Sequence, residues 1–193
     1  MIFSATVPGY IQELAAKRMT NPILVDLVGN DTNQVPERII NKAVLVKDES
    51  AMFKHVQTYI EANRDKKVII FTETKQLAKD FEKLTYASFL TLHGDLEQNQ
   101  REIRLKKYRE LSSKFVLVAT DVASRGLDID DIDVVIQCGC RHIDSFVHRS
   151  GRTGRVGKEG MNVLFFQPED FKFVLDLEDQ LNIKISIQQS LFE

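Results

Sequence analysis

Apolar, β-branched segments alternate with amphipathic segments along most of this chain, and this alternation constrains the fold more than any other feature. Short apolar runs separated by helix-length stretches are typical of βα units, whose strands pair in parallel because each helix carries the chain back across the sheet. The sequence predicts six such strands, near residues 42–47, 67–72, 88–92, 115–119, 133–138 and 161–166.

Between the predicted strands, apolar residues recur at helical spacing. These residues are Phe53, Val56 and Ile60, then Leu77, Phe81 and Leu84, then Ile103, Leu105 and Tyr108, and finally Phe173, Leu175 and Leu181. A short strand over 183–187 follows the last helix. We therefore predict a doubly wound α/β fold, a parallel sheet with helices on both faces.

Polar segments directly follow three of the predicted strands: Thr72-Glu73-Thr74, His93-Gly94-Asp95 and Thr120-Asp121. In a parallel sheet the carboxyl ends of the strands share one edge, where helix N-termini present unpaired N–H groups. These segments are therefore expected to offer N–H groups and hydroxyls to successive phosphates of one strand.

The charge of the chain is nearly balanced, with a formal net charge of -2. This balance argues against a diffuse basic surface for nucleic acid. Between residues 141 and 158, however, five Lys or Arg face a single acid, Asp144. A contact with phosphate is therefore expected to be local, within this segment.

Two further features of the composition indicate an intracellular soluble protein. No apolar run approaches the ~20 residues that span a bilayer, so no membrane partner is expected. Cys138 and Cys140 are the only cysteines, and they form neither a disulfide framework nor a four-ligand zinc set. Both thiols are predicted to be reduced and structural, and no metal site is predicted.

The segment His148-Arg149-Ser150-Gly151-Arg152-Thr153-Gly154-Arg155 places three arginines three residues apart. Arginine is charged at every physiological pH, and its planar fork of donors matches phosphoryl oxygens. Gly151 and Gly154 lack the Cβ atoms that would hold a ligand away. The segment is predicted to meet phosphate, with a solvated basic turn as the alternative.

This segment resembles the last motif of the DEAD-box RNA helicases, and four other matches occur in the order of that family. They are Phe3-Ser4-Ala5-Thr6, Val68 to Lys75, His93-Gly94-Asp95 with Gln98 and Arg101, and Ala119 to Asp128. The chain is similar to the second, C-terminal RecA-like domain of such a helicase. The resemblance implies that the full-length protein is an ATP-dependent RNA helicase that unwinds duplexes locally.

The resemblance also implies roles for individual residues. Arg152 and Arg155 match the two arginine fingers that meet the γ-phosphate of ATP, and Gly126 and Asp128 match residues beside the ATP ribose. Mg²⁺ would be held by the first RecA-like domain, which is a partner outside this chain. The other partner is RNA, bound by residues at the matching positions Thr74, Gly94, Gln98, Arg101, Thr120, Asp121, Arg125 and Arg149.

The first residues are expected to belong to a different domain. Ser4 and Thr6 lie in a motif that ends a strand of the first RecA-like domain, and His148 is implied to contact that domain. We predict that residues 1–36 are the tail of the first domain plus the interdomain linker, and that 37–193 are the C-terminal RecA-like domain.

Local alternatives concern helix capping. Asp95 with Gln98 three residues later has the spacing of a capping box, and Asp48 before Glu49 is expected to cap a helix.

Alternatives also exist for the kind of protein. Ser150, where isoleucine is commoner, is similar to the Gu-type nucleolar RNA helicases and to some bacterial and organellar members, which leaves the nucleolus or the cytoplasm as the compartment. Cys138-Gly139-Cys140-Arg141 departs from the Tyr-Asp-x-Pro segment of many members. A superfamily 2 DNA helicase or remodeller and a non-catalytic RNA-binding module are the other functions considered, and His148 and Thr153 argue against the former.

We predict that the 193-residue chain alone hydrolyses ATP no faster than background. The nearest approach to a phosphate-binding loop is Gly157-Lys158, but Arg152 stands where the first glycine is needed and Glu159 where Ser or Thr is needed. Phosphate release by the purified chain, with and without RNA, is the measurement. RNA-stimulated turnover would contradict the prediction.

Overall fold

The computed structural model describes residues 9–20, 23, 35–111, 115–121, 129, 132–155 and 157–189. The chain divides into two compact units, residues 1–34 and 35–193. In the first unit the described element is helix α1 (Gly9–Arg18), whose last turn carries Lys17 and Arg18. Ser4 and Thr6 lie outside the described residues, and the origin of residues 1–36 stays a prediction.

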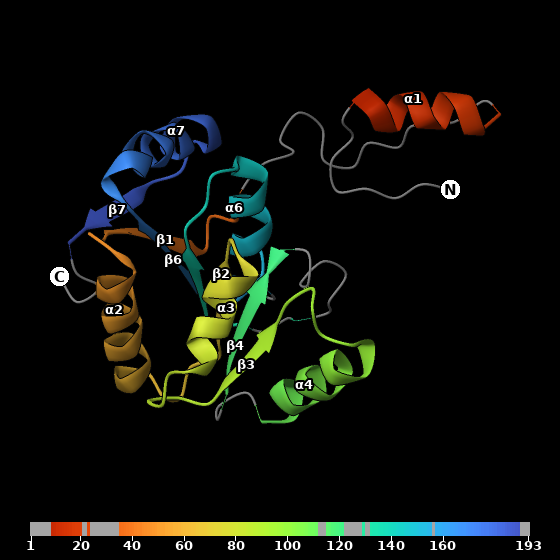
Figure 1. The fold of residues 1–193 in the computed structure, drawn as a ribbon. Helices are drawn as coiled ribbons and strands as arrows, with labels where there is room; N and C mark the ends of the chain where they lie inside the picture. Colours follow the sequence, from red (N-terminus) through yellow and green to blue (C-terminus); the bar gives the residue numbers. More distant parts are fainter. Residues whose placement is uncertain are drawn as a thin grey trace. The chain divides into compact units, whose positions relative to one another are not determined.

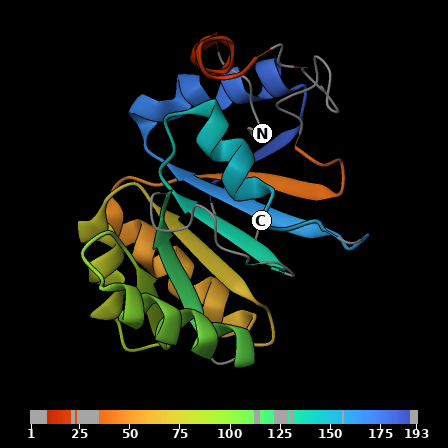
Figure 2. The same ribbon diagram turned by 90° about the vertical axis from the view of Figure 1, so that its right-hand side faces the viewer.

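The second unit is built on a seven-stranded parallel sheet (Figures 1 and 2). Its strands are β1 (Ile39–Leu45), β2 (Val68–Thr72), β3 (Phe89–Leu92), β4 (Val116–Thr120), β5 (Val134–Cys138), β6 (Gly160–Phe166) and β7 (Ile185–Gln188). They lie in the order β3-β4-β2-β5-β6-β1-β7, and all six strand pairings are parallel. The predicted fold class is confirmed.

Helices cover both faces of this sheet (Figure 2). One face packs against α2 (Glu49–Ala62) and α3 (Lys75–Glu82), and the other against α4 (Gln98–Glu110), α6 (Ile143–Ser150) and α7 (Phe171–Leu181), which follows the 3-10 turn η2 (Pro168–Asp170). Among the described helices, none has the length and apolar character that crossing a membrane requires.

Strand β2 shows how the two cores are separated. Val68 and Ile70 join the core under α2 and α3, whereas Ile69 and Phe71 join the core on the opposite face. Because successive side chains of a strand point to opposite faces, a strand covered on both sides is apolar at every position, as β2 is.

The two capping predictions had different outcomes. Asp48 caps α2, where its Oδ1 accepts a hydrogen bond from the Ala51 N–H at 2.8 Å. The capping box of Asp95 and Gln98 is wrong: α4 begins at Gln98 with Glu97 at the N-cap and no side-chain cap. The Asp95 carboxylate instead binds two lysines of α3.

One strand boundary and one helix differ from the sequence prediction. Strand β1 begins at Ile39 rather than near 42, although Asn41 and Lys42 make its start polar. Asn41 is only 7% exposed and finds a partner in Asn162 of β6, so its amide is satisfied inside the core. Helix α6 was not predicted. Residues 143–147 were assigned to no element, and the arginine segment 148–155 was interpreted as a tight turn.

A chain of buried amides crosses strands β5, β6 and β1. Gln137 Nε2 donates to Asn162 Oδ1 at 2.9 Å, and Asn162 Nδ2 donates to Asn41 Oδ1 at 2.9 Å. Asn41 Nδ2 then donates to the Ile39 carbonyl at 3.2 Å. Gln137 and Asn162 have no exposed surface. Each amide therefore depends on its neighbours for hydrogen bonds that water cannot supply.

Replacing Asn162 by Ala should lower the free energy of unfolding by about 2 to 4 kcal/mol, because it leaves polar groups of both Gln137 and Asn41 unsatisfied. The measurement is denaturant unfolding of Asn162→Ala, Asn41→Ala and the double variant. The cost of the double variant should be well below the sum of the two single costs. Additive costs would show that the amides do not depend on one another.

Candidate functional site

The carboxyl ends of β3, β4 and β2 lie side by side. Thr72 is in register with Thr120, and Leu92 with Ala119. Because paired strands are about 4.8 Å apart, the polar residues that follow these strands begin at one edge of the sheet. The expected juxtaposition of the three segments is therefore observed.

Two residues predicted to bind RNA lie exposed at this edge. Thr74 is the N-cap of α3, where its Oγ1 accepts a hydrogen bond from the Leu77 N–H at 3.1 Å. Gly94 is exposed, and a Cβ added to it would meet no atom within 4 Å. Packing therefore does not require a glycine at this position. The neighbouring His93 is buried, and this burial lowers the pKa of its imidazole.

Gln98 and Arg101 lie on the first turn of α4. Gln98 is exposed and donates to Glu102 Oε1 at 2.9 Å. Arg101 is half-buried, and its Nε has no hydrogen-bond partner among the described residues. Arg104, which the sequence analysis did not select, donates to the Thr91 carbonyl and to Glu82 Oε1, both at 2.7 Å. Arg104 therefore ties α4 to β3 and α3.

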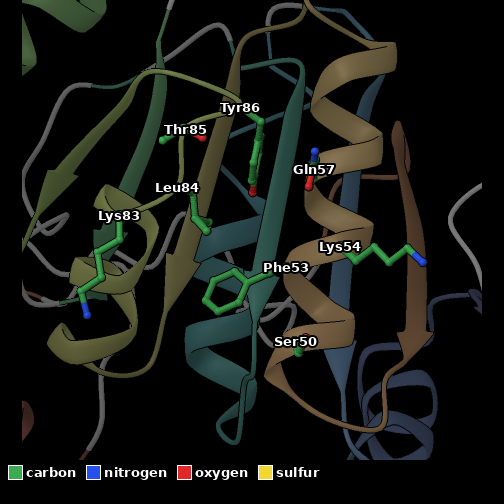
Figure 3. Close-up of a pocket in the computed structure, with 8 residues that line it drawn as sticks. All are labelled: Ser50, Phe53, Lys54, Gln57, Lys83, Leu84, Thr85 and Tyr86. Carbon is green, nitrogen blue, oxygen red and sulfur yellow. The ribbon is translucent and has the colours of Figure 1, made fainter.

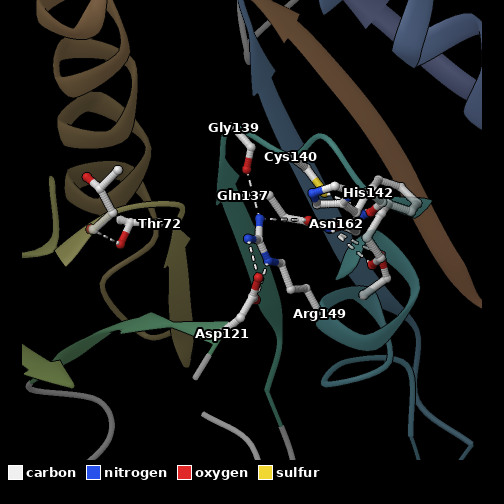
Figure 4. Close-up of polar contacts among 11 residues, drawn as sticks. Thr72, Asp121, Gln137, Gly139, Cys140, His142, Arg149 and Asn162 are labelled. Atoms are coloured by element: carbon white, nitrogen blue, oxygen red, sulfur yellow. Dashed lines mark hydrogen bonds and ion pairs between the residues drawn. The ribbon is translucent and has the colours of Figure 1, made fainter. Parts of the chain in front are cut away.

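Arg149 is buried rather than exposed (Figure 4). Its Nε and Nη2 donate to the two carboxylate oxygens of Asp121 at 2.7 and 2.8 Å, and its Nη1 donates to the Gly139 carbonyl at 2.8 Å. The guanidinium carbon also lies 5.7 Å from the centre of the Phe71 ring. The pKa of Arg149 is raised above its usual value because the hydrogen bonds and charge of Asp121 outweigh the effect of burial.

The burial of Arg149 changes the interpretation of Arg149 and Asp121, which were both predicted to bind RNA. Arg149 is 3% exposed, so its guanidinium lies inside the domain, and it holds Asp121, the residue after the last residue of β4. Thr120 is itself 9% exposed. The arrangement favours an indirect role for Arg149, which fixes the chain where it leaves β4.

Arg152 and Arg155 lie in the loop that follows α6. Thr153 anchors this loop, because its hydroxyl donates to the Ile132 carbonyl at 2.5 Å and its backbone pairs with Ile132. Arg155 Nε donates to the Gly151 carbonyl at 2.7 Å. Arg155 is exposed, Arg152 is half-buried, and His148 is exposed on the last turn of α6.

Two glycines allow the loop to pack closely. Gly154 has a φ of +68°, a left-handed conformation, and a Cβ there would lie 2.6 Å from Ile39 Cγ1. At Gly160, the first residue of β6, a Cβ would overlap the Thr153 hydroxyl and the Gly154 backbone nitrogen. The loop carrying Arg152 and Arg155 is therefore held against the starts of β1 and β6.

The structure separates the two predicted phosphate-binding regions. The arginine loop contacts Ile132, which precedes β5, whereas Arg149 reaches Gly139, which follows it. Seven residues of extended chain span roughly 20 Å. The arginine pair thus lies at the amino ends of the strands, not at the carboxyl ends where the other predicted residues gather. Arg125, Gly126 and Asp128 lie outside the described residues.

The character of the arginine loop suits phosphate. Two guanidinium groups three residues apart provide charge and hydrogen-bond donors that match phosphoryl oxygens.

Cys138 and Cys140 are buried free thiols, and burial raises the pKa of both above the usual range. Among the described residues, no group of three or more potential metal ligands occurs.

Two cavities of the domain have linings that differ from the basic arginine loop. A groove of about 430 Å³ lies between α2 and the end of α3 (Figure 3), and it contains no predicted site residue. A second pocket of about 170 Å³ lies beside Thr74, but its lining includes the acids Asp48, Glu49, Glu73 and Asp170 against one cation, Arg141. These acids disfavour a phosphate in the second pocket.

Gly160→Ala should destabilise the domain by about 1 to 3 kcal/mol, because the new methyl group overlaps the loop. The same substitution at Gly94 should leave stability unchanged, since the space beside Gly94 is open. Thermal unfolding tests both, and hydrogen exchange at residues 152–155 should accelerate only in Gly160→Ala. Equal melting temperatures for the two variants would contradict the packing described for the loop.

Comparison with known proteins gives a consistent assignment. The family described as "Helicase conserved C-terminal domain" matches residues 51–157. The chain is 37% identical over 193 residues to DEAD-box ATP-dependent RNA helicase 53 of Oryza sativa subsp. japonica, which covers 96% of this chain and 31% of that protein. It is 36% identical over 191 residues to Nucleolar RNA helicase 2 of Rattus norvegicus, covering 95% of this chain and 24% of that protein.

Solved structures agree with this assignment. Mss116p bound to ssRNA and AMP-PNP superposes with a TM-score of 0.76 and 31% identity, over 96% of this chain and 40% of that one. Mss116p DEAD-box helicase domain 2 bound to an RNA duplex superposes with a TM-score of 0.63 and 32% identity, over 77% of this chain and 64% of that one. The chain spans about a third or less of the curated relatives it matches. It belongs to the helicase conserved C-terminal domain family, as the C-terminal domain of a DEAD-box RNA helicase.

Proposed function

We propose that this domain supplies Arg152 and Arg155 to ATP and supplies half of an RNA-binding surface, within an enzyme that unwinds RNA duplexes locally. The observation that carries the proposal is the fixed arginine loop. Thr153, Gly154 and Gly160 hold it against Ile132 and the starts of β1 and β6, so the arginines are presented from a rigid base. Preorganised charge stabilises a transition state without a reorganisation cost at the moment of reaction.

ATP would be shared between two domains. The arginines neutralise charge on the transferring phosphoryl group, a step in which positioning and electrostatics supply most of the catalysis. The P-loop, the Asp-Glu-x-Asp motif and Mg²⁺ belong in the proposal to a preceding RecA-like domain. Residues 1–36 are proposed to be its tail and the linker, with Ser4, Thr6 and His148 at the junction. Gly126 and Asp128 are proposed to lie beside the ribose.

RNA would cross the edge formed by the carboxyl ends of β3, β4 and β2. Thr74 and Gly94 are exposed there, and the half-buried Arg101 lies on the first turn of α4, where its buried Nε has no hydrogen-bond partner among the described residues. With Gln98, Thr120, Asp121 and Arg125, these groups suit phosphates and riboses rather than bases, which fits an enzyme that acts on many sequences. The RNA bound by domain 2 of Mss116p supports an RNA site within this half alone.

The compartment proposed for the parent protein is the nucleolus if it is of the Gu type, and otherwise the cytoplasm. Similarity to a nucleolar helicase of rat and to plant DEAD-box helicases is of the same order, so the Gu-type nucleolar assignment rests chiefly on Ser150. In this structure Ser150 is fully buried, and its hydroxyl donates to the Phe146 carbonyl at 2.6 Å.

In the full-length protein, Arg152→Ala and Arg155→Ala should each lower RNA-stimulated ATPase by about 10³-fold or more. RNA crosslinking should be largely retained, because the arginine loop lies at the opposite ends of the strands from the RNA edge. Arg64→Ala, which removes an exposed guanidinium before β2, is the control and should keep full turnover. Unchanged turnover in both loop variants would instead favour a non-catalytic RNA-binding module.

A further inference from the structure

Two lysines at the carboxyl edge of the sheet are bound by one carboxylate. Lys75 Nζ lies 2.9 Å from Asp95 Oδ1, and Lys79 Nζ lies 2.8 Å from Asp95 Oδ2. Each ammonium group thus binds a different oxygen of the Asp95 carboxylate. The side chains of Lys75, Lys79 and Asp95 are 62%, 39% and 42% exposed, so the cluster is open to solvent.

The cluster lies within the proposed RNA surface. Lys75 directly follows Thr74, and Asp95 directly follows Gly94. Lys79 lies one helical turn beyond Lys75, on the same side of α3. A strand of RNA that contacts Thr74 and Gly94 would pass beside both ammonium groups.

The fold does not require this ion pairing. Helix α3 begins at a capped Thr74 and is anchored by buried Ala78 and Phe81. Exposed ion pairs contribute little to stability, so their loss costs little. A phosphodiester, like a carboxylate, carries one negative charge and two terminal oxygens, and it can take the same two donors.

We propose that Lys75 and Lys79 form an additional phosphate-binding site on the RNA edge, and that Asp95 occupies this site until an RNA phosphodiester displaces its carboxylate. The inference rests on the proposed RNA-binding function and adds two contacts to it. Asp95 thereby weakens the binding of a single phosphate, and it favours strands that engage the whole edge.

The ionisation of Asp95 indicates that RNA, and not protonation, displaces its carboxylate from the two lysines. Hydrogen bonds from Lys79 and then Lys75 lower the pKa of Asp95 to about 2. The carboxylate is therefore charged at every physiological pH, and the pairing is lost by protonation only near pH 2.

The test is equilibrium binding of a fluorescein-labelled oligouridylate to the 193-residue chain over a series of KCl concentrations. Asp95→Asn should tighten binding by roughly threefold to fivefold, the range that one or two exposed ionic contacts provide. The slope of log affinity against log salt should steepen by about 0.7, the value for one phosphate on a single strand, because no displaced Asp95 carboxylate is left to take up a cation when the lysines bind RNA. Adding Lys75→Ala and Lys79→Ala should abolish the gain.

Asp80→Asn is the matched control. Asp80 binds Lys83 at 2.6 Å near the other end of α3, where Lys83 lines the groove of Figure 3. This variant makes the same charge change and frees one lysine of the same region, but it should leave RNA affinity unchanged.

Three results would overturn the proposal. Equal gains in Asp95→Asn and Asp80→Asn would show an effect of bulk charge. RNA binding by the wild type without a gain of affinity in Asp95→Asn would reject the competition by Asp95 but would not contradict the proposed RNA surface. Absence of binding by every variant, to the oligonucleotide and to an RNA duplex, would reject the proposed RNA surface as well.

Discussion

The buried ion pair of Arg149 and Asp121 is the interaction on which the arrangement of this domain depends. Arg149 joins the end of β4, the turn after β5 and helix α6 through Asp121, the Gly139 carbonyl and its own backbone. A buried guanidinium is tolerated only where hydrogen bonds and an opposite charge replace water. Any arrangement of these three segments that separated the pair would leave a buried charge without compensation.

The same constraint extends across the sheet toward the arginine loop. Gln137 Nε2 contacts α6 through the Phe146 carbonyl and the Ser150 hydroxyl, and it begins the amide chain that ends at Ile39. Ile39 in turn packs against Gly154. The loop with the two proposed catalytic arginines is thus supported by polar groups whose hydrogen bonds leave little choice of position. Rigid support of this kind suits groups that must meet a phosphoryl group at a fixed place.

The alternation of apolar and amphipathic segments was sufficient to predict the fold class and to place most strands within one to three residues. It placed the start of β1 three residues too late and left Asn41 outside the strand, because whether this polar residue lies inside the strand depends on a partner 121 residues away in sequence. The alternation also failed to predict α6, because its apolar residues Ile143, Phe146 and Val147 form only a short run before the polar, arginine-rich segment 148–155. The three strand ends were expected to meet because parallel strands share an edge, a rule that needs no side-chain detail.

The sequence by itself determined the βα architecture, the candidate residues for binding phosphate and the membership of one family, since periodicity and residue chemistry are local properties. Only the tertiary structure decided which of these charges reach the surface. Arg149 and Arg152 are three residues apart, yet the first lies in the last turn of a helix and points into the domain, whereas the second lies in the loop. Asp95 binds Lys75 and Lys79 rather than capping α4 because the strand order brings α3 beside the end of β3. Pairing between distant segments is set by packing, which local spacing does not encode.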